Sequence, residues 1–141
     1  NGGSGADALH LAEELVGRYD RDRRSLAAIC LNADPTLLTC IGNDFGFDEV
    51  FARQIEGLGR RNDLLVCFTT SGNSMNILRA LAAAKKTGVT TVALLGKGGG
   101  QAKGRADLEL IVDSPDTARI QEAHTVILHA LLERIERELI G

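Results

Sequence analysis

The chain has 141 residues, of which 44% are hydrophobic, 25% are charged and 4% are aromatic, and this composition is typical of one soluble globular domain. A net charge of −3 excludes the basic surface that nucleic-acid binding usually needs, so we expect no nucleic-acid partner. No apolar run approaches the roughly 20 residues that span a membrane. With no visible signal peptide and three scattered cysteines, the sequence favours a reducing, cytoplasmic location without membrane partners.

The first half of the chain predicts helices around one short strand. Apolar residues recur at helical spacing over residues 6–19. The apolar run at 26–31 predicts a buried strand. Asp34 and Pro35 then match the N-cap and first position of a helix, and a further helix is expected at 48–58.

In the second half, apolar strands and amphipathic helices alternate. We expect a buried strand at 63–69, a helix ended by Gly88, a strand at 90–95, a glycine-rich surface loop or short helix at 96–104, a strand at 107–112 and a long helix from Thr117. Alternation of this kind predicts an α/β fold, a doubly wound parallel sheet flanked by helices in a flavodoxin-like, three-layer αβα arrangement. Four strands are expected in one domain spanning residues 1–141.

Two segments have the chemistry of an anion site. Asn1-Gly2-Gly3-Ser4 is predicted to be a turn, and Thr69-Thr70-Ser71-Gly72-Asn73-Ser74 lies between a predicted strand and a predicted helix. A helix N-terminus offers free N–H groups to a phosphate. A capped helix start is the simpler interpretation, but capping needs only one such side chain. The surplus of hydroxyl groups therefore favours phosphate binding.

Two polar pairs on separate helices are candidate metal ligands. His10 and Glu14 are four residues apart and share a helix face, and Gln121 and His129 are eight apart on the last helix. His124 points away from His129. Taken singly, the first pair also fits a partly exposed ion pair and His129 also fits a core histidine. The combination of both pairs with an anion loop favours a functional site.

Five segments together resemble the sedoheptulose 7-phosphate isomerase (phosphoheptose isomerase) family of SIS domains. They read NGGSGADALHLAEELVGRY, CIGNDFGFDEVFARQIEGLGR, TTSGNSMNILRALAAAKKTG, LLGKGGGQAKGRADLELIV and TARIQEAHTVILHALLERIE, and they cover nearly the whole chain in family order. Two departures are visible: the family carries an N-terminal helix and a first strand before the Asn-Gly-Gly-Ser segment, and Thr69 replaces a serine of some relatives.

The resemblance implies a Zn²⁺ ion held by His10, Glu14, Gln121 and His129. It also implies substrate and phosphate contacts from Asn1, Gly2, Gly3, Ser4, Arg18, Asn43, Asp44, Thr69, Thr70, Ser71, Asn73, Ser74 and Gln121. The family is a homotetramer with active sites between subunits, and its heptose phosphate product feeds lipopolysaccharide or another glycoconjugate.

The expected reaction is the conversion of sedoheptulose 7-phosphate to D-glycero-D-manno-heptose 7-phosphate through an enediol. Glu14 is the expected base at carbon, His129 the partner acid and base, and zinc the group that polarises the carbonyl. Two alternatives stay open. One is a non-catalytic SIS binding module like the bacterial replication-initiation regulator, and the other is an isomerase or sensor of another sugar phosphate, such as an amino-sugar phosphate.

Overall fold

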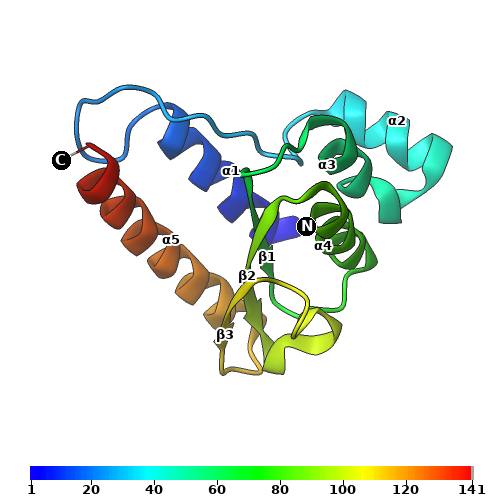
Figure 1. The fold of residues 1–141 in the computed structure, drawn as a ribbon. Helices are drawn as coiled ribbons and strands as arrows, with labels where there is room; N and C mark the ends of the chain where they lie inside the picture. Colours follow the sequence, from blue (N-terminus) through cyan, green and yellow to red (C-terminus); the bar gives the residue numbers. More distant parts are fainter. Residues whose placement is uncertain (141) are drawn as a thin grey trace.

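A computed structural model describes the backbone of residues 1–140 and the side chains of residues 1–139. Its centre is a sheet of three parallel strands in the order β1 (Leu64–Thr69), β2 (Thr90–Gly96) and β3 (Leu108–Val112). Helices cover both faces of the sheet, which Figure 1 shows nearly edge-on. The predicted α/β fold with a parallel sheet between helical layers is confirmed.

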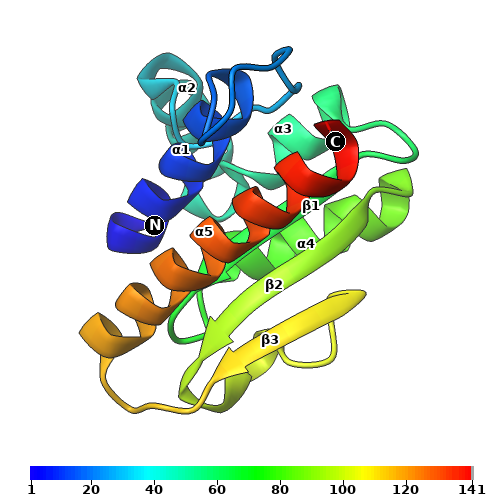
Figure 2. The same cartoon turned by 90° about the vertical axis from the view of Figure 1, so that its left-hand side faces the viewer.

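One face of the sheet is covered by α1 (Gly2–Val16) and the long helix α5 (Thr117–Ile140), which runs along the strands in roughly the opposite direction to β2 and β3 (Figure 2). The core on this side is formed by Leu11, Phe68, Leu94, Leu128 and Leu132. Because neighbouring residues of a strand point to opposite faces, Phe68 and Leu94 face these two helices. Among the described residues, no helix is long and apolar enough to cross a bilayer.

On the other side, α4 (Met75–Thr87) packs on the sheet. The helix α3 (Ala52–Leu58) and the 3₁₀ turn η1 (Phe47–Glu49) pack on α4, and α2 (Pro35–Phe45) packs on η1. The side chain of Asp34 caps α2 and Gly88 ends α4 with a φ of 76°, as the sequence predicts. The single helix expected at 48–58 is instead divided into η1 and α3.

Two predictions for the first 31 residues are wrong. Gly2, Gly3 and Ser4 form the first turn of α1 rather than a loop. Residues 26–31 are not a strand, so the described sheet has three strands instead of four. The apolar composition of 26–31 predicts burial, but a strand also needs a hydrogen-bonded neighbour. Here an open cavity of about 620 Å³ lies between residues 27–32 and β1.

The glycine-rich segment after β2 forms the 3₁₀ helix η2 (Lys97–Ala102), which packs against the loop that follows β1. The Ala102 N–H donates to the Gly72 carbonyl at 2.9 Å. A Cβ atom on Gly72 would lie 1.9 Å from the Gly99 carbonyl oxygen. The short helix that the sequence offers as one alternative at 96–104 is therefore confirmed, and its surface character holds except at Gly99 and Ala102, which are buried.

Candidate active site

Helices α1 and α5 run side by side in the same direction (Figures 1 and 2). A Cβ on Gly3 would meet the Gln121 amide, and the Thr125 hydroxyl donates to Asp7 at 2.9 Å. One turn further along, the rings of His10 and His129 lie 5.1 Å apart. From each of these contacts to the next, the chain advances by three or four residues, or about one turn, on both helices. The two polar faces predicted from the sequence therefore lie opposite each other.

His10, Glu14 and His129 form the centre of the site. The His10 Nε2 atom lies 3.3 Å from Glu14 Oε1, and the His10 and His129 rings meet edge to face at 80°. Tyr19 stacks on the other side of His129, with ring centroids 5.8 Å apart and an interplanar angle of 25°. All four residues are partly buried, so each keeps part of its surface exposed.

Three side chains of α1 at this centre could hold a metal ion. Ligand atoms of His10, Glu13 and Glu14 all lie within 4.8 Å of one another. Imidazole nitrogen and carboxylate oxygen are both common zinc ligands. Glu13 is absent from the sequence-based ligand set, although its three-residue spacing from His10 is also a same-face spacing. Gln121 lies against Gly3 at the start of α1, so the structure places it beside the predicted anion segment.

The N-termini of α1 and α4 meet at the carboxyl end of β1. The side-chain amides of Asn1 and Asn76 exchange two hydrogen bonds of 2.9 and 3.0 Å and hold the two helix starts together. Each start carries partial positive charge and N–H groups without partners inside the helix. Ser74 is the N-cap of α4, yet its side chain makes no capping hydrogen bond. Its hydroxyl oxygen is therefore not engaged by the first N–H groups of α4, which remain free for a ligand.

The loop from Thr69 to Ser74 is held by its own polar side chains. The Thr69 hydroxyl oxygen accepts from the Gly72 N–H, and the Ser71 hydroxyl oxygen accepts from the Asn73 N–H, both at 3.2 Å. Asn73 in turn accepts from the Gln101 N–H of η2 at 3.0 Å. Because both hydroxyl groups serve as acceptors inside the loop, they keep their protons to donate to an anion. Thr70 lies between them and is half-buried.

Three predicted substrate residues are not brought to this centre within one chain. Arg18 is exposed in the segment that follows α1. Asn43 and Asp44 are exposed on α2, which lies on the other side of the sheet from α5 (Figure 1). The Asn43 amide donates to Asp44 at 2.7 Å, so the two side chains present one polar group at the surface.

His124 is a core residue. Its side chain is fully buried, its Nε2 atom lies 3.1 Å from the Leu95 carbonyl oxygen, and its ring packs edge-on against Phe68. The prediction that His124 and His129 point in different directions agrees with these contacts.

Asp7, which sequence reasoning missed, is also buried, and its Oδ2 atom has no hydrogen-bond partner among the described residues.

Comparisons with known proteins show the family of this chain. The SIS domain family matches residues 1–96. The chain is 52% identical to a phosphoheptose isomerase of Sulfurimonas denitrificans over 141 residues, which is 100% of this chain and 72% of that protein. It is 51% identical to a phosphoheptose isomerase of Campylobacter concisus over 100% of this chain and 75% of the relative.

Solved structures show the same fold. A phosphoheptose isomerase from Francisella tularensis superposes with a TM-score of 0.94 at 38% identity, covering 98% of this chain and 74% of that one. Phosphoheptose isomerase GmhA from Neisseria gonorrhoeae gives a TM-score of 0.89 at 44% identity, covering 97% and 73%. The chain therefore belongs to the phosphoheptose isomerase family of SIS-domain enzymes, which are sugar-phosphate isomerases.

Proposed function

We propose that this protein converts sedoheptulose 7-phosphate to D-glycero-D-manno-heptose 7-phosphate. The observation that carries the proposal is the contact of His129 on α5 with His10, which is paired with Glu14 on α1, the helix whose N-terminus meets that of α4. A carboxylate and an imidazole across one site are the acid–base groups that an aldose–ketose isomerisation needs.

The proton transfers balance with these two residues. The Glu14 carboxylate takes the proton from C1 while the N–H of the His129 ring nitrogen that does not hold zinc donates its proton to the C2 carbonyl oxygen, which gives the enediol. In the second half, Glu14 returns its proton to C2 and His129 takes the proton from the C1 hydroxyl, which gives the aldehyde. Each side chain ends in its starting protonation state, so no further reactant is needed.

We propose that His10, Glu14, Gln121 and His129 hold a zinc ion. The close donor atoms of His10 and Glu14 support their part of this assignment, and the contact between the His10 and His129 rings supports that of His129. When bound, zinc would supply a Lewis acid that polarises the substrate carbonyl. Glu14 has two carboxylate oxygens, and only Oε1 faces His10, so the other oxygen is free for proton transfer.

The phosphate end of the substrate is assigned to the start of α4. Thr69, Ser71 and Ser74 supply hydroxyl donors there, and the α4 dipole adds partial positive charge. The same phosphate end is bordered by further predicted residues, which are Asn1, Gly2, Gly3, Ser4, the half-buried Thr70 and the exposed Asn73. On this assignment the phosphate would lie at one end of the α1–α5 contact and the reacting carbons near His129.

We further propose that the active form is a homotetramer in which Asn43 and Asp44 reach the site of a neighbouring subunit. Phe45 and Phe47 next to them are 52% and 63% exposed. Aromatic side chains this exposed, beside polar groups with a predicted substrate role, suit a surface that another subunit covers. Arg18 is exposed as well and is free to contact substrate from such an arrangement.

The test is to measure product formation from sedoheptulose 7-phosphate with and without a chelator, for the wild type and for Glu14→Gln. We expect the chelator to abolish turnover and zinc to restore it. Loss of the base should lower kcat by roughly 10²–10⁴-fold. Metal content is measured on each sample, and Glu122→Gln, an exposed carboxylate on α5, is the matched control.

Turnover of Glu14→Gln within a factor of a few of wild type, with zinc bound, would remove Glu14 from the mechanism. Binding of the substrate without turnover by the wild type would favour the non-catalytic SIS module. Turnover of an amino-sugar phosphate in preference to the heptose would assign another substrate.

A further inference from the structure

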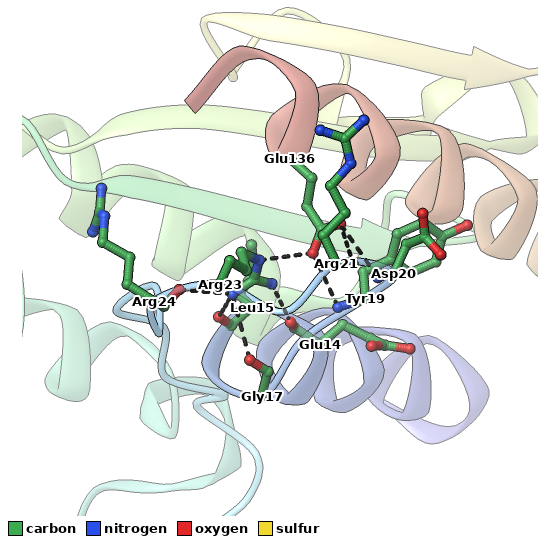
Figure 3. A network of polar contacts seen from close by, with 9 residues as sticks. All are labelled: Glu14, Leu15, Gly17, Tyr19, Asp20, Arg21, Arg23, Arg24 and Glu136. Carbon is green, nitrogen blue, oxygen red and sulfur yellow. Dashed lines mark hydrogen bonds and ion pairs between the residues drawn. The ribbon is translucent and has the colours of Figure 1, made fainter. Parts of the chain in front are cut away.

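A buried ion pair joins the segment after α1 to the end of α5. The Arg23 Nε atom donates to Glu136 Oε1 at 2.7 Å, and the two side chains are 0% and 4% exposed. Neither residue belongs to the site described above. The pair is isolated from water, and it links positions 113 residues apart in the sequence (Figure 3).

Glu136 fixes the segment that carries Tyr19. Its carboxylate accepts the backbone N–H groups of Tyr19, Asp20 and Arg21 at 3.1, 3.2 and 3.1 Å. Three consecutive N–H groups bound to one carboxylate leave this segment little freedom to move relative to α5. The orientation of the Tyr19 ring against His129 therefore depends on a side chain seven residues after His129 on the same helix.

Arg23 fixes the end of α1. Its guanidinium group donates to the carbonyl oxygens of Glu14 at 2.7 Å, Leu15 at 3.1 Å and Gly17 at 3.4 Å, and to that of Arg24 at 3.1 Å. The last carbonyl groups of a helix have no partners inside the helix, and a buried cation there also suits the helix dipole. The backbone of Glu14 is thus bonded directly to Arg23 (Figure 3).

We propose that Arg23 and Glu136 are positioning residues for the isomerase centre. They hold Glu14 of α1 and the Tyr19 ring in fixed positions relative to His129 of α5. This inference rests on the proposed function. The two groups assigned to proton transfer lie on different helices, and this pair is the polar link between those helices at that end of the site. A displacement of about 1 Å between reacting groups costs up to about 100-fold in rate.

The deciding variant is the double substitution Arg23→Met with Glu136→Leu. Replacing a buried ion pair by apolar residues of similar volume is often neutral or stabilising, so this variant is expected to fold. The matched control is Arg134→Met with Glu138→Leu, because that pair lies on the same helix at 2.7 Å but is 72% and 58% exposed. Arg23→Lys is a second variant that keeps the charge but loses the forked donor geometry.

Two readouts separate positioning from a structural role. The first is kcat and KM for sedoheptulose 7-phosphate, measured well below the unfolding temperature of each variant. The second is the tyrosine band in near-ultraviolet circular dichroism, because Tyr19 is the only tyrosine and the chain has no tryptophan. This band reports the Tyr19 ring without any need for catalysis.

We expect both Arg23 variants to lose the wild-type tyrosine band and at least about ten-fold in kcat, with KM within about three-fold, while the control pair keeps both. Wild-type kcat and an unchanged tyrosine band in the folded double variant would overturn the proposal, as would a lowered unfolding temperature with wild-type kcat. If the wild type lacks isomerase activity while the tyrosine band still depends on Arg23, the proposed function fails and the ordering of Tyr19 by this pair stands.

Discussion

Glu136 is a buried carboxylate that stays charged because four donors surround it. Burial alone raises the pKa of a carboxyl group, but the hydrogen bonds from Arg23 and from three backbone N–H groups outweigh it and hold the pKa of Glu136 at about 2. The folded protein therefore binds a proton at Glu136 less readily than the unfolded chain, whose carboxyl has the ordinary value of 4.5. The charged form contributes stability above that value, and the contribution is lost as the pH falls from 4.5 towards about 2.

This difference in the pKa of Glu136 between the folded and unfolded states predicts that stability depends on pH in acid, and substitution of Glu136 should remove that dependence. We expect the unfolding temperature of wild type to exceed that of Glu136→Gln at neutral pH, and the gap to narrow as the pH falls through this window. Comparing the two proteins cancels the titration of the other carboxylates, including Asp107 and Glu109, whose pKa values are also lowered by hydrogen bonds despite some burial. A gap of constant size from neutral pH to pH 2 would contradict the assignment.

The spacing of residues in the sequence predicted contacts within one helix, but it missed contacts between residues that are distant in the sequence. His10 and Glu14 were predicted to share a face from their four-residue spacing, and the structure places them 3.3 Å apart. Arg23 and Glu136 carry no such signal, because no periodicity relates positions 113 residues apart. Tyr19 was missed for the same reason, since only the fold brings its ring to His129.

At the scale of elements, the hydrophobic pattern located every strand that has a pairing partner. The predicted strands at 63–69, 90–95 and 107–112 match β1, β2 and β3 to within one residue at each end. The equally apolar segment at 26–31 has no such partner and stays irregular. The hydrophobic pattern of the sequence indicates which residues can be buried. Strand formation also needs a neighbouring strand, which that pattern does not reveal.

The loop after β1 depends on a glycine for its contact with η2. Gly72 has a φ of +65°, and a Cβ there would lie 1.9 Å from the Gly99 carbonyl oxygen. We expect Gly72→Ala to lower the free energy of unfolding by at least about 1–2 kcal/mol, the cost of a left-handed residue with a side chain, before the clash is counted. Because the loop carries Thr69 and Ser71, the KM for a phosphorylated sugar should also rise.

Gly57→Ala is the matched control for this substitution. Gly57 lies in α3 with a helical backbone, and a Cβ there has nothing within 4 Å. Alanine at such a position stabilises a helix by up to about 1 kcal/mol. Equal unfolding temperatures and equal KM values for Gly72→Ala and Gly57→Ala would show that the loop does not need the Gly72–Gly99 contact.

At the scale of the whole molecule, β1 has a partner on one side only. Its other side faces the cavity of about 620 Å³, across which lies the extended segment that includes Ile29. Ile29 and Leu64 are 70% and 59% exposed at this cavity. An open edge of backbone N–H and C=O groups between apolar walls is costly and favours pairing with a further strand. Asn1 also lines the cavity, so a strand joined to it has direct access.

We expect the chain of residues 1–141, expressed alone, to unfold at low temperature and to associate rather than stay monomeric. Joining a strand-forming segment of alternating Val and Thr before Asn1 should raise the unfolding temperature and give a single molecular mass, because the added strand pairs with β1 and with residues 26–31. A Gly/Ser extension of equal length is the matched control, since it has the same reach but low strand propensity. Thermal unfolding and light scattering on the three proteins measure the effect. A cooperative transition from a monodisperse monomer of residues 1–141 would show that the open edge of β1 needs no partner.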